Sequence, residues 1–436
     1  MRDLVYERLQ HRLRIFAPKK ASVLKEWADN PFPKKDDLIV WIGENATILP
    51  LKQFPEDNLC FGRAGVVDSA GGYIALSSIP DRVEFSYPVD HPERREERVV
   101  YCGYLAKQWG HFLIESVARL WYALENSASY DRLIFVTEDG APCHIGGNYK
   151  AFLELLGLYD KVEILNKPVT FKEVLVPQVA YQRRRFYTDR FNSIFDRIIS
   201  NVPVPEGWSG ADKVFLSRSH LKNIRKSEYG HDLLDHYFER NGYRVVYPET
   251  MSLSELILLL THCSECASVS GTLPHNMLFA PNGCKLTILE RNVLNNEIQL
   301  DINIMKALHV TCVDANIPIY PVSVGYGPII MAYNDYLSKY TQDHHYRKPD
   351  ASYTSRQYLK KCFVSYMKAY QKAYRYQWYM ADWMLPYNDY LYEGYCDCLK
   401  YFGDYLYGKK PFLPTHYFMP HYWKQVVKWL LKALRK

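Results

Sequence analysis

The sequence lacks any run of eighteen or more apolar residues, and its start, Met1 to Arg8, contains no apolar signal core. A helix that crosses a bilayer needs about 20 mostly apolar residues, and a secretory signal needs an apolar segment near the N-terminus. With 48% hydrophobic and 23% charged residues in 436, the chain is typical of globular proteins and is long enough for two domains and a smaller third unit. We therefore expect a cytosolic protein.

The sequence also lacks the cysteine spacing of a disulfide framework or a zinc site. Its ten cysteines are scattered, with close pairs only at Cys263 with Cys266 and Cys396 with Cys398. His262 precedes the first pair, but no second pair at zinc-ligand spacing follows. No Asp-x-Asp stands at the end of a predicted strand. We expect ordinary reduced thiols, no metal ion and no cofactor.

Positive charge is plentiful only near the C-terminus. The net charge is +6, and residues 351–436 hold 14 Lys or Arg against 5 Asp or Glu. Residues 329–436 are rich in Tyr and Trp and predict helices, notably over 356–380 and 421–436. In the last helix Lys recurs every four residues opposite an apolar stripe, a pattern typical of interfacial membrane helices. We predict a helical, basic, Tyr-rich extension that contacts a membrane surface; packing of that stripe on the protein is the alternative. No RRM, KH or zinc-finger signature favours nucleic-acid binding.

The rest of the chain alternates strand and helix patterns, which is typical of α/β folds with parallel sheets. Strands are predicted at 133–136, 162–165, 214–216 and 286–289, among others, and a capped helix begins near Ser252. The segment Pro203 to Gly207 has the composition of a hinge. We predict a helical appendage at 1–35 with a basic helix over 3–16, Rossmann-like domains at 36–205 and 206–328, and the extension at 329–436.

Two motifs in this α/β region occur in a recognisable order. The first is Trp109-Gly110-His111-Phe112-Leu113-Ile114-Glu115. The second runs from Phe215-Leu216-Ser217-Arg218 through Arg225 and Glu228 to Gly271, Asn276-Met277-Leu278-Phe279-Ala280-Pro281 and Glu290. This order resembles glycosyltransferase family 61 over roughly residues 100–310, although this chain has Ser270-Gly271-Thr272 where the family usually carries His-Gly-Ala. The resemblance implies a GT-B-like pair of domains facing a cleft and inverting sugar transfer from a nucleotide donor.

In that setting the later domain supplies the donor site. Ligands of open α/β sheets bind where strands end and helices begin, and the polar residues of this stretch fall there. Arg218 and Arg225 suit a diphosphate, Gly271 permits close backbone approach, and Glu290 suits ribose hydroxyls. The full predicted donor set is Ser217, Arg218, Arg225, Gly271, Thr272, His275, Asn276 and Glu290. The structural alternatives are an ion pair of Arg218 with Glu228 or Asp232, a tight turn at Gly271, and a surface ion pair of Glu290.

The earlier domain supplies the base. His111 is expected at a helix start, where the helix dipole keeps its ring neutral. Glu115 and Arg119 follow at i+4 and i+8 on the same face. Either His111 or Glu115 takes the acceptor proton, and Arg119 balances the charge of Glu115. A helix-capping histidine above an ordinary ion-pair ladder is the alternative.

These observations predict a metal-independent hexosyl- or pentosyltransferase that uses a nucleotide sugar, expected to be UDP-linked. The acceptor is expected to be a lipid-linked surface glycan of a bacterium, such as capsule or lipopolysaccharide, at the inner face of the cell membrane. A phosphosugar or polyol-phosphate transferase of polymer assembly would need the same phosphate-binding residues. A non-catalytic glycan-binding scaffold with the same fold is the third alternative.

Overall fold

The computed structural model describes positions 24, 26, 29, 357, 358, 361, 362 and 365 and the ranges 13–16, 32–54, 62–78, 86–221, 228–291, 296–316 and 329–355. The predicted helix over 421–436, its membrane contact and Arg225 lie outside the described residues. Within the predicted helix over 356–380, all five described positions are helical. Among the described residues, no helix is both long and apolar enough to cross a bilayer.

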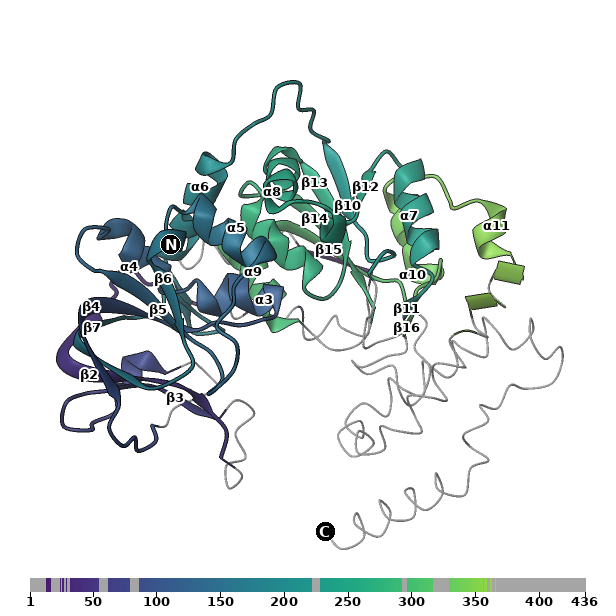
Figure 1. Ribbon diagram of the computed structural model, residues 1–436. Helices are drawn as coiled ribbons and strands as arrows, with labels where there is room; N and C mark the ends of the chain where they lie inside the picture. The colour runs from purple at the N-terminus through teal and green to yellow at the C-terminus, as the bar shows by residue number, and fades with distance from the viewer. Residues whose placement is uncertain are drawn as a thin grey trace, which may run out of the picture.

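The later part of the chain forms a six-stranded, fully parallel sheet, which we call the second sheet (Figure 1). Its order is β1 (Leu13–Phe16), β15 (His309–Asp314), β14 (Lys285–Glu290), β13 (Glu265–Val269), β10 (Lys213–Leu216) and β12 (Arg244–Val246). From β10 the chain moves to β12 on one side and then returns to β13 on the other. The strand order therefore reverses between β10 and β13, which is where such sheets bind ligands.

Helices cover both faces of this sheet, so its strands are apolar along their whole length. Val214 and Leu216 pack against α8 (Leu253–His262) and α9 (Glu297–Met305), whereas Phe215 faces α7 (His231–Arg240) and α10 (Asp335–Asp343). The short parallel pair β11 (Glu228–Tyr229) and β16 (Ile329–Ile330) and the helix α11 (Ala351–Thr354) complete this half. The predicted cap of α8 is confirmed, because Ser252 and Glu255 form a reciprocal capping box.

The earlier part forms a mixed sheet, which we call the first sheet. Its order is β3 (Arg63–Val67), β2 (Val40–Lys52), β7 (Val169–Pro177), β4 (Glu93–Tyr104), β5 (Arg132–Val136) and β6 (Val162–Leu165). The last four strands in this order are parallel, and β2 runs antiparallel to both of its neighbours. The chain leaves β4 towards β5 on one side and reaches β7 on the other. This sheet therefore has its own reversal of strand order, beside the carboxyl end of β4.

The two sheets share one apolar core. Helices α5 (Gly147–Leu155) and α6 (Asp189–Asn201) lie between the first sheet and α8 (Figure 1). The ring of Phe279, from the 3-10 helix η6 (Leu273–Phe279), contacts Phe195 at 5.5 Å and Phe152 at 6.4 Å between centroids. The mixed α/β class is confirmed, whereas the GT-B-like arrangement and the domain limits stay predictions.

The N-terminal segment differs from the prediction of a helix over 3–16. Leu13–Phe16 form β1, an edge strand that pairs in parallel with β15. Alternating side chains explain the difference, because Leu13 and Ile15 pack on one core and Phe16 on the other. Further along, Phe32 is buried against Tyr181 and Tyr187 before the chain enters β2. The described residues of this segment therefore pair with the second sheet and pack against Tyr181 and Tyr187, and the limits of the appendage at 1–35 stay a prediction.

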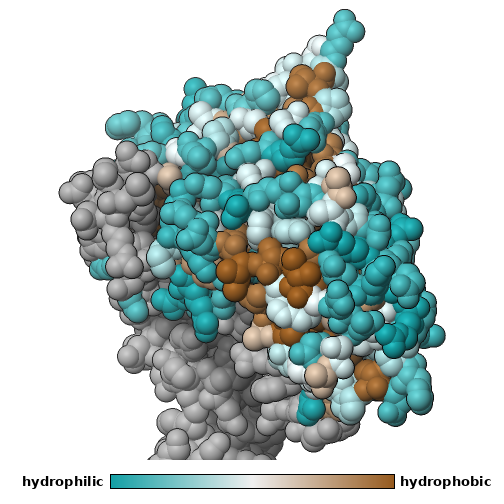
Figure 2. Space-filling view, turned by 90° about the vertical axis from the view of Figure 1, so that its left-hand side faces the viewer, coloured by the Kyte–Doolittle hydropathy of each residue, from teal (hydrophilic) through white to brown (hydrophobic). Residues whose placement is uncertain are grey.

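Figure 2 shows a group of apolar side chains on an otherwise largely hydrophilic face of the molecule. Among the described residues, the large apolar side chains with the highest exposure are Ile39, Ile42 and Val204. Folded proteins commonly leave some apolar side chains exposed to solvent. We assign no function to these three.

Candidate active site

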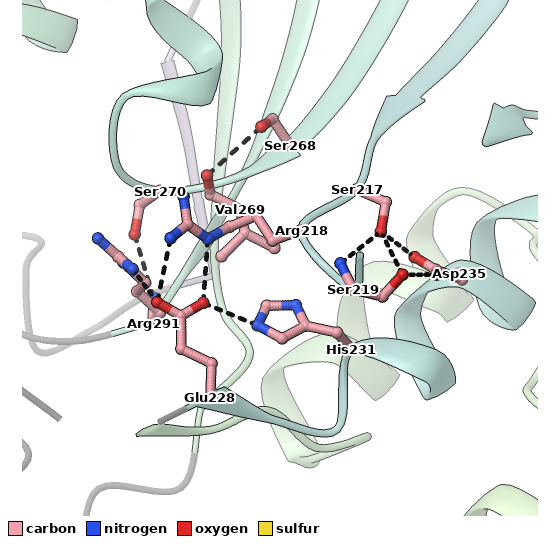
Figure 3. A network of polar contacts seen from close by, with 10 residues as sticks. All are labelled: Ser217, Arg218, Ser219, Glu228, His231, Asp235, Ser268, Val269, Ser270 and Arg291. Carbon is pink, nitrogen blue, oxygen red and sulfur yellow. Dashed lines mark hydrogen bonds and ion pairs between the residues drawn. The ribbon is translucent and has the colours of Figure 1, made fainter. Parts of the chain in front are cut away.

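A buried ion cluster lies at the reversal point of the second sheet (Figure 3). Arg218 lies two residues beyond β10. Its guanidinium donates two hydrogen bonds to the carboxylate of Glu228, from Nε to Oε2 at 3.0 Å and from Nη2 to Oε1 at 3.2 Å. Arg291, the first residue after β14, pairs with Oε1 of the same carboxylate. His231, the first residue of α7, contacts Oε2 at 2.9 Å. The Glu228 side chain is fully buried, so four elements are fixed around one carboxylate.

The cluster holds its charged groups in ionised form. Burial by itself raises the pKa of Glu228, but the hydrogen bond from His231 and the charges of Arg291 and Arg218 outweigh it and hold that pKa far below its usual value. The carboxylate is therefore ionised at neutral pH. Burial lowers the pKa of Arg291, and Glu228 and Glu290 both oppose this shift. The side chains of Arg218 and Arg291 are 8% and 11% exposed, so two guanidinium groups are held side by side in a nearly buried setting. Such a pair suits the oxygens of an anionic ligand.

Gly271 brings the backbone after β13 against these guanidinium groups. Its φ of +138° is one that glycine adopts readily and other residues rarely do. A Cβ at this position would lie 3.0 Å from Nη2 of Arg291 and 3.5 Å from Nη1 of Arg218. Ser270 strengthens the junction by accepting a hydrogen bond from the Arg291 amide at 3.2 Å. The glycine is therefore required by a close approach beside two cations, which goes beyond the alternative of a simple tight turn.

Ser217 faces a different partner. Its hydroxyl donates to Asp235 on α7 at 2.5 Å, and the hydroxyl of Ser219 donates to the other oxygen of Asp235 at 2.6 Å (Figure 3). The amide of Ser219 also donates to Ser217 Oγ at 3.1 Å. These bonds fix the turn that carries Arg218. Ser217 thus holds the turn, and its direct contact with a donor stays a prediction.

His275 and Asn276 lie in η6, next to this cluster. Asn296, the N-cap of α9, donates from Nδ2 to the carbonyl of Gly271 at 2.7 Å and contacts Nε2 of His275 at 3.0 Å. Since an amide nitrogen only donates, Nε2 accepts and the neutral ring carries its proton on Nδ1. Burial lowers the pKa of His275 to about 4, the Asn296 bond opposes this shift, and nearby His111 adds to it. Asn276 accepts a hydrogen bond from Trp109 Nε1 at 2.9 Å.

The two sequence motifs meet at Gly110. A Cβ on this residue would lie 2.6 Å from His275 Nδ1 and 2.9 Å from Thr272 Cγ2, so only glycine allows the contact. Gly271, the residue before Thr272, lies in turn against the guanidinium of Arg218. His111 directly follows Gly110, so the candidate base lies next to this contact between the two motifs. The predicted base and the predicted donor residues are therefore brought together by contacts between elements about 160 residues apart in the sequence.

The helix that carries the candidate base is irregular. The sequence predicts a regular helix that begins at His111, but α3 (Trp109–His111) passes into a π-helical turn (Phe112–Ser116) before α4 (Leu120–Glu125). His111 Nδ1 and Glu115 Oε1 are 3.2 Å apart, with side chains 26% and 22% exposed. Turns of this kind occur often at functional sites. The pair is thus accessible to solvent and is held by an uncommon backbone geometry.

Arg119 does not have the predicted position. It is buried, and its guanidinium donates to the backbone carbonyls of Pro177, Leu76 and Ser78 at 3.0, 2.7 and 2.9 Å. The π-helical turn changes the register after Glu115, so an i+4 pattern extended to 119 gives the wrong face. Arg119 therefore holds β7 and the 75–77 turn in place, and the prediction that it balances Glu115 is wrong.

The last predicted donor residue, Glu290, ends β14 and is buried. The alternative of a surface ion pair is therefore wrong, and its contact with a ribose stays a prediction. Sequence reasoning missed Arg291, His231 and Asn296. Arg291 had an available signal, because it follows the strand end that drew attention to Glu290. Asn296 had the weaker signal of a helix-capping residue type.

No arrangement of three or more His, Cys, Asp or Glu side chains suitable for a metal ion occurs in the described ranges. The described cysteines, seven in number, carry free thiols. Independence of metal ions stays a prediction.

Comparison with known proteins agrees with the motifs. The family model described as Glycosyltransferase 61 matches residues 109–287, a range that contains Gly110, His111, Arg218 and Gly271. The match defines the protein as a glycosyltransferase. Over residues 109–287 the chain matches glycosyltransferase family 61, as its two motifs predicted.

Curated proteins gave no match. Among solved structures, the bacterial iron-containing dodecameric glycosyltransferase TibC from enterotoxigenic E. coli aligns with 10% identity and a TM-score of 0.23, over 60% of this chain and 80% of that chain. A similarity this low does not establish a shared fold.

Proposed function

We propose that the protein transfers a sugar, with inversion, from a nucleotide diphosphate donor to a hydroxyl group of a glycan, and that uridine diphosphate is the leaving group. The observation that carries this proposal is the position of Arg218 and Arg291 beside the backbone of Gly271, in contact through His275 with the segment that holds His111. Cations for the departing diphosphate and a base for the acceptor are the two needs of this reaction.

On the donor side, the diphosphate lies against Gly271 and the two guanidinium groups. Forked guanidinium groups match phosphate oxygens, and a rigid, nearly buried pair stabilises the developing charge without reorganising. Glu228 positions both arginines and keeps them from repelling each other. It is a positioning residue, since its side chain is fully enclosed by its partners.

On the acceptor side, the attacking hydroxyl oxygen forms a bond to the anomeric carbon while the bond from that carbon to the diphosphate oxygen breaks. The diphosphate leaves with the bonding electrons, and the hydroxyl proton passes to His111 or to Glu115. With Glu115 accepting from Nδ1 of His111, the Nε2 atom is the proton acceptor. The alternative is direct transfer to the Glu115 carboxylate.

We further propose that the acceptor is a surface glycan of a bacterium, such as capsule or lipopolysaccharide, and that the enzyme works at the inner face of the cell membrane. The support is the charge of residues 351–436, with 14 Lys or Arg against 5 Asp or Glu. Truncation after residue 420 tests the membrane contact. It is expected to move the protein from the membrane fraction to the soluble fraction, and an unchanged distribution would refute the contact.

Thermal-shift screening against nucleotide sugars and nucleotides tests the donor, because a ligand that binds only the folded state raises the melting temperature. UDP is expected to stabilise the wild type and to have little effect on Arg218→Ala. The matched control, Arg197→Gln, removes an exposed arginine of α6 and is expected to behave like the wild type.

Product analysis separates the alternatives. Release of a nucleoside diphosphate supports glycosyl transfer, whereas release of CMP supports phosphosugar or polyol-phosphate transfer. No nucleotide release by the wild type, together with unchanged glycan assembly in cells that carry His111→Ala or Glu115→Ala, would favour the non-catalytic scaffold.

A further inference from the structure

Two aromatic rings are stacked at the carboxyl edge of the second sheet, next to the candidate donor residues. Tyr247 is the first residue after β12, and His220 lies in the turn that follows β10. Their ring centroids are 3.7 Å apart and the ring planes differ by 14°, so the two rings lie face to face. His220 is exposed, and Tyr247 covers one face of its ring, which leaves the opposite face open to solvent. Neither ring takes part in the ion cluster around Glu228.

A carboxylate of α7 fixes the stacked pair to the turn that carries Arg218. The Tyr247 hydroxyl donates to Oδ2 of Asp235 at 3.3 Å, and the same oxygen accepts a hydrogen bond from the Ser219 hydroxyl at 2.6 Å. Ser219 lies between Arg218 and His220 in the chain, so one turn carries both a guanidinium group and an aromatic ring. A ring that is held in place before a ligand arrives loses little conformational freedom on binding.

The stacked pair lies within reach of a ligand on Arg218. His220 is two residues further along the chain, so the two Cα atoms are at most about 7 Å apart. Figure 3 shows the Arg218 side chain directed to the ion cluster around Glu228, with Ser219 and Asp235 on the other side. The edge of the sheet therefore offers cations and a flat ring one after the other, as a nucleotide offers a diphosphate and a flat base joined by one ribose.

We propose that the base of the nucleotide donor stacks on the exposed face of His220, with Tyr247 as the layer behind it, while the diphosphate lies on Arg218 and Arg291. The assignment rests on the proposed glycosyl transfer, to which it adds the binding site of the base. Every base has a π-face, so stacking on an aromatic side chain contributes affinity for a nucleotide and little choice among bases.

This orientation of the nucleoside differs from the one that a ribose contact with Glu290 would give. Glu290 ends β14, which β13 separates from β10, whereas Tyr247 follows β12 on the other side of β10. A nucleoside stacked on His220 therefore extends away from Glu290. The two positions are alternatives, and replacement of His220 decides between them.

Calorimetric binding of two probes to the full-length protein tests the proposal. UDP carries the base, and inorganic pyrophosphate carries only the diphosphate. The wild type is expected to bind UDP at least roughly tenfold more tightly than pyrophosphate, the usual size of base–aromatic stacking. His220→Asn removes the ring and is expected to lower the affinity for UDP by a similar factor, while the affinity for pyrophosphate stays unchanged. His220→Phe keeps a flat ring and is expected to bind UDP like the wild type.

The matched control is His91→Asn, which removes an exposed histidine two residues before β4. Asparagine tolerates the left-handed φ of +51° at this position. The control is expected to bind both probes like the wild type, and the melting temperature and pyrophosphate binding of each variant report its folding and its diphosphate site. Equal affinity of the wild type for the two probes, or undiminished UDP affinity in His220→Asn, overturns the proposal. A wild type that binds neither probe overturns the proposed function, and the base site with it.

Discussion

The two sheets contribute different kinds of polar site to one junction. The second sheet is fully parallel and holds its charges in a buried cluster, with the Glu228 side chain 0% exposed. The first sheet is mixed, and the helical segment beside it presents His111 and Glu115 at 26% and 22% exposure. A group that binds a leaving diphosphate gains from a dry, rigid setting, whereas a base must be reached by its acceptor. The difference therefore matches a division of labour between donor binding and acceptor activation.

Replacement of His111 or Glu115 is expected to have the largest effect, and that effect is on turnover. Because His111 and Glu115 are partly exposed, we expect their removal to reduce turnover and to leave folding almost unchanged. One of His111→Ala and Glu115→Gln is expected to lower kcat by roughly 100- to 10,000-fold, the usual contribution of a general base. Transfer assays with the screened donor, together with the melting temperature, measure both quantities. If both variants lose stability while their folded molecules keep the wild-type kcat, this assignment is wrong.

Replacement of Glu228 in the buried cluster is expected to act first on the free energy of unfolding. Glu228→Gln leaves two nearly buried guanidinium groups without their carboxylate, and breaking a buried ion pair costs about 3–5 kcal/mol. Urea unfolding at neutral pH measures this loss. The matched control is Glu154→Gln, which breaks an exposed pair with Lys150 and is expected to change the free energy of unfolding by less than about 1 kcal/mol. Similar losses in both variants would mean that the cluster is not what stabilises the second sheet.

Because His275 is buried and neutral in the candidate active site, the stability of the protein is expected to depend on pH. Burial lowers its pKa in the folded protein to about 4, so the unfolded chain takes up this proton first as pH falls. The contribution of neutral His275 to stability is therefore complete above the ordinary histidine value of about 6.5 and is lost progressively as pH falls towards 4, by roughly 3 kcal/mol in all.

His275→Gln is expected to remove this slope, as urea unfolding between pH 4 and 7 can show. Asp301 must be considered because burial raises its pKa to about 6, so its contribution falls as pH rises through the same window. Subtracting the variant's curve from that of the wild type isolates His275. A difference curve that is flat between pH 4 and 6.5 would refute its neutral, buried state.

The smallest expected effect concerns the contact between the two sheets. Gly110→Ala places a Cβ 2.6 Å from His275 Nδ1, and overpacking of this kind costs typically 1–3 kcal/mol. Gly157→Ala is the control for glycine replacement at a surface turn, since no atom lies within 4 Å of its would-be Cβ, although its φ of +71° adds some strain. Transfer activity is expected to fall more in Gly110→Ala than in Gly157→Ala. Equal activity in the two would show that the Gly110 contact is not needed for the site.

The sequence by itself determined the α/β class, the family match over residues 109–287 and most element positions. Its strand patterns predicted 162–165 as observed, and Ser252 with Glu255 carried the cap of α8. These features depend on residues close together in the chain, which is why local patterns reveal them. The same holds for Arg218 and Gly271, since strand ends can be read locally even though their partners cannot.

Only the tertiary structure decided which groups face one another. Leu13–Phe16 became a strand because β15 offered an unpaired edge, against their helical pattern. Arg119 turned from Glu115 to three backbone carbonyls because a π-helical turn shifted the register. Arg291 and Asn296 acquired roles through contacts with residues about 20 to 60 positions away. Such pairings depend on how sheets and helices pack, and the free energy that selects them comes from the whole core, so no local stretch of sequence specifies them.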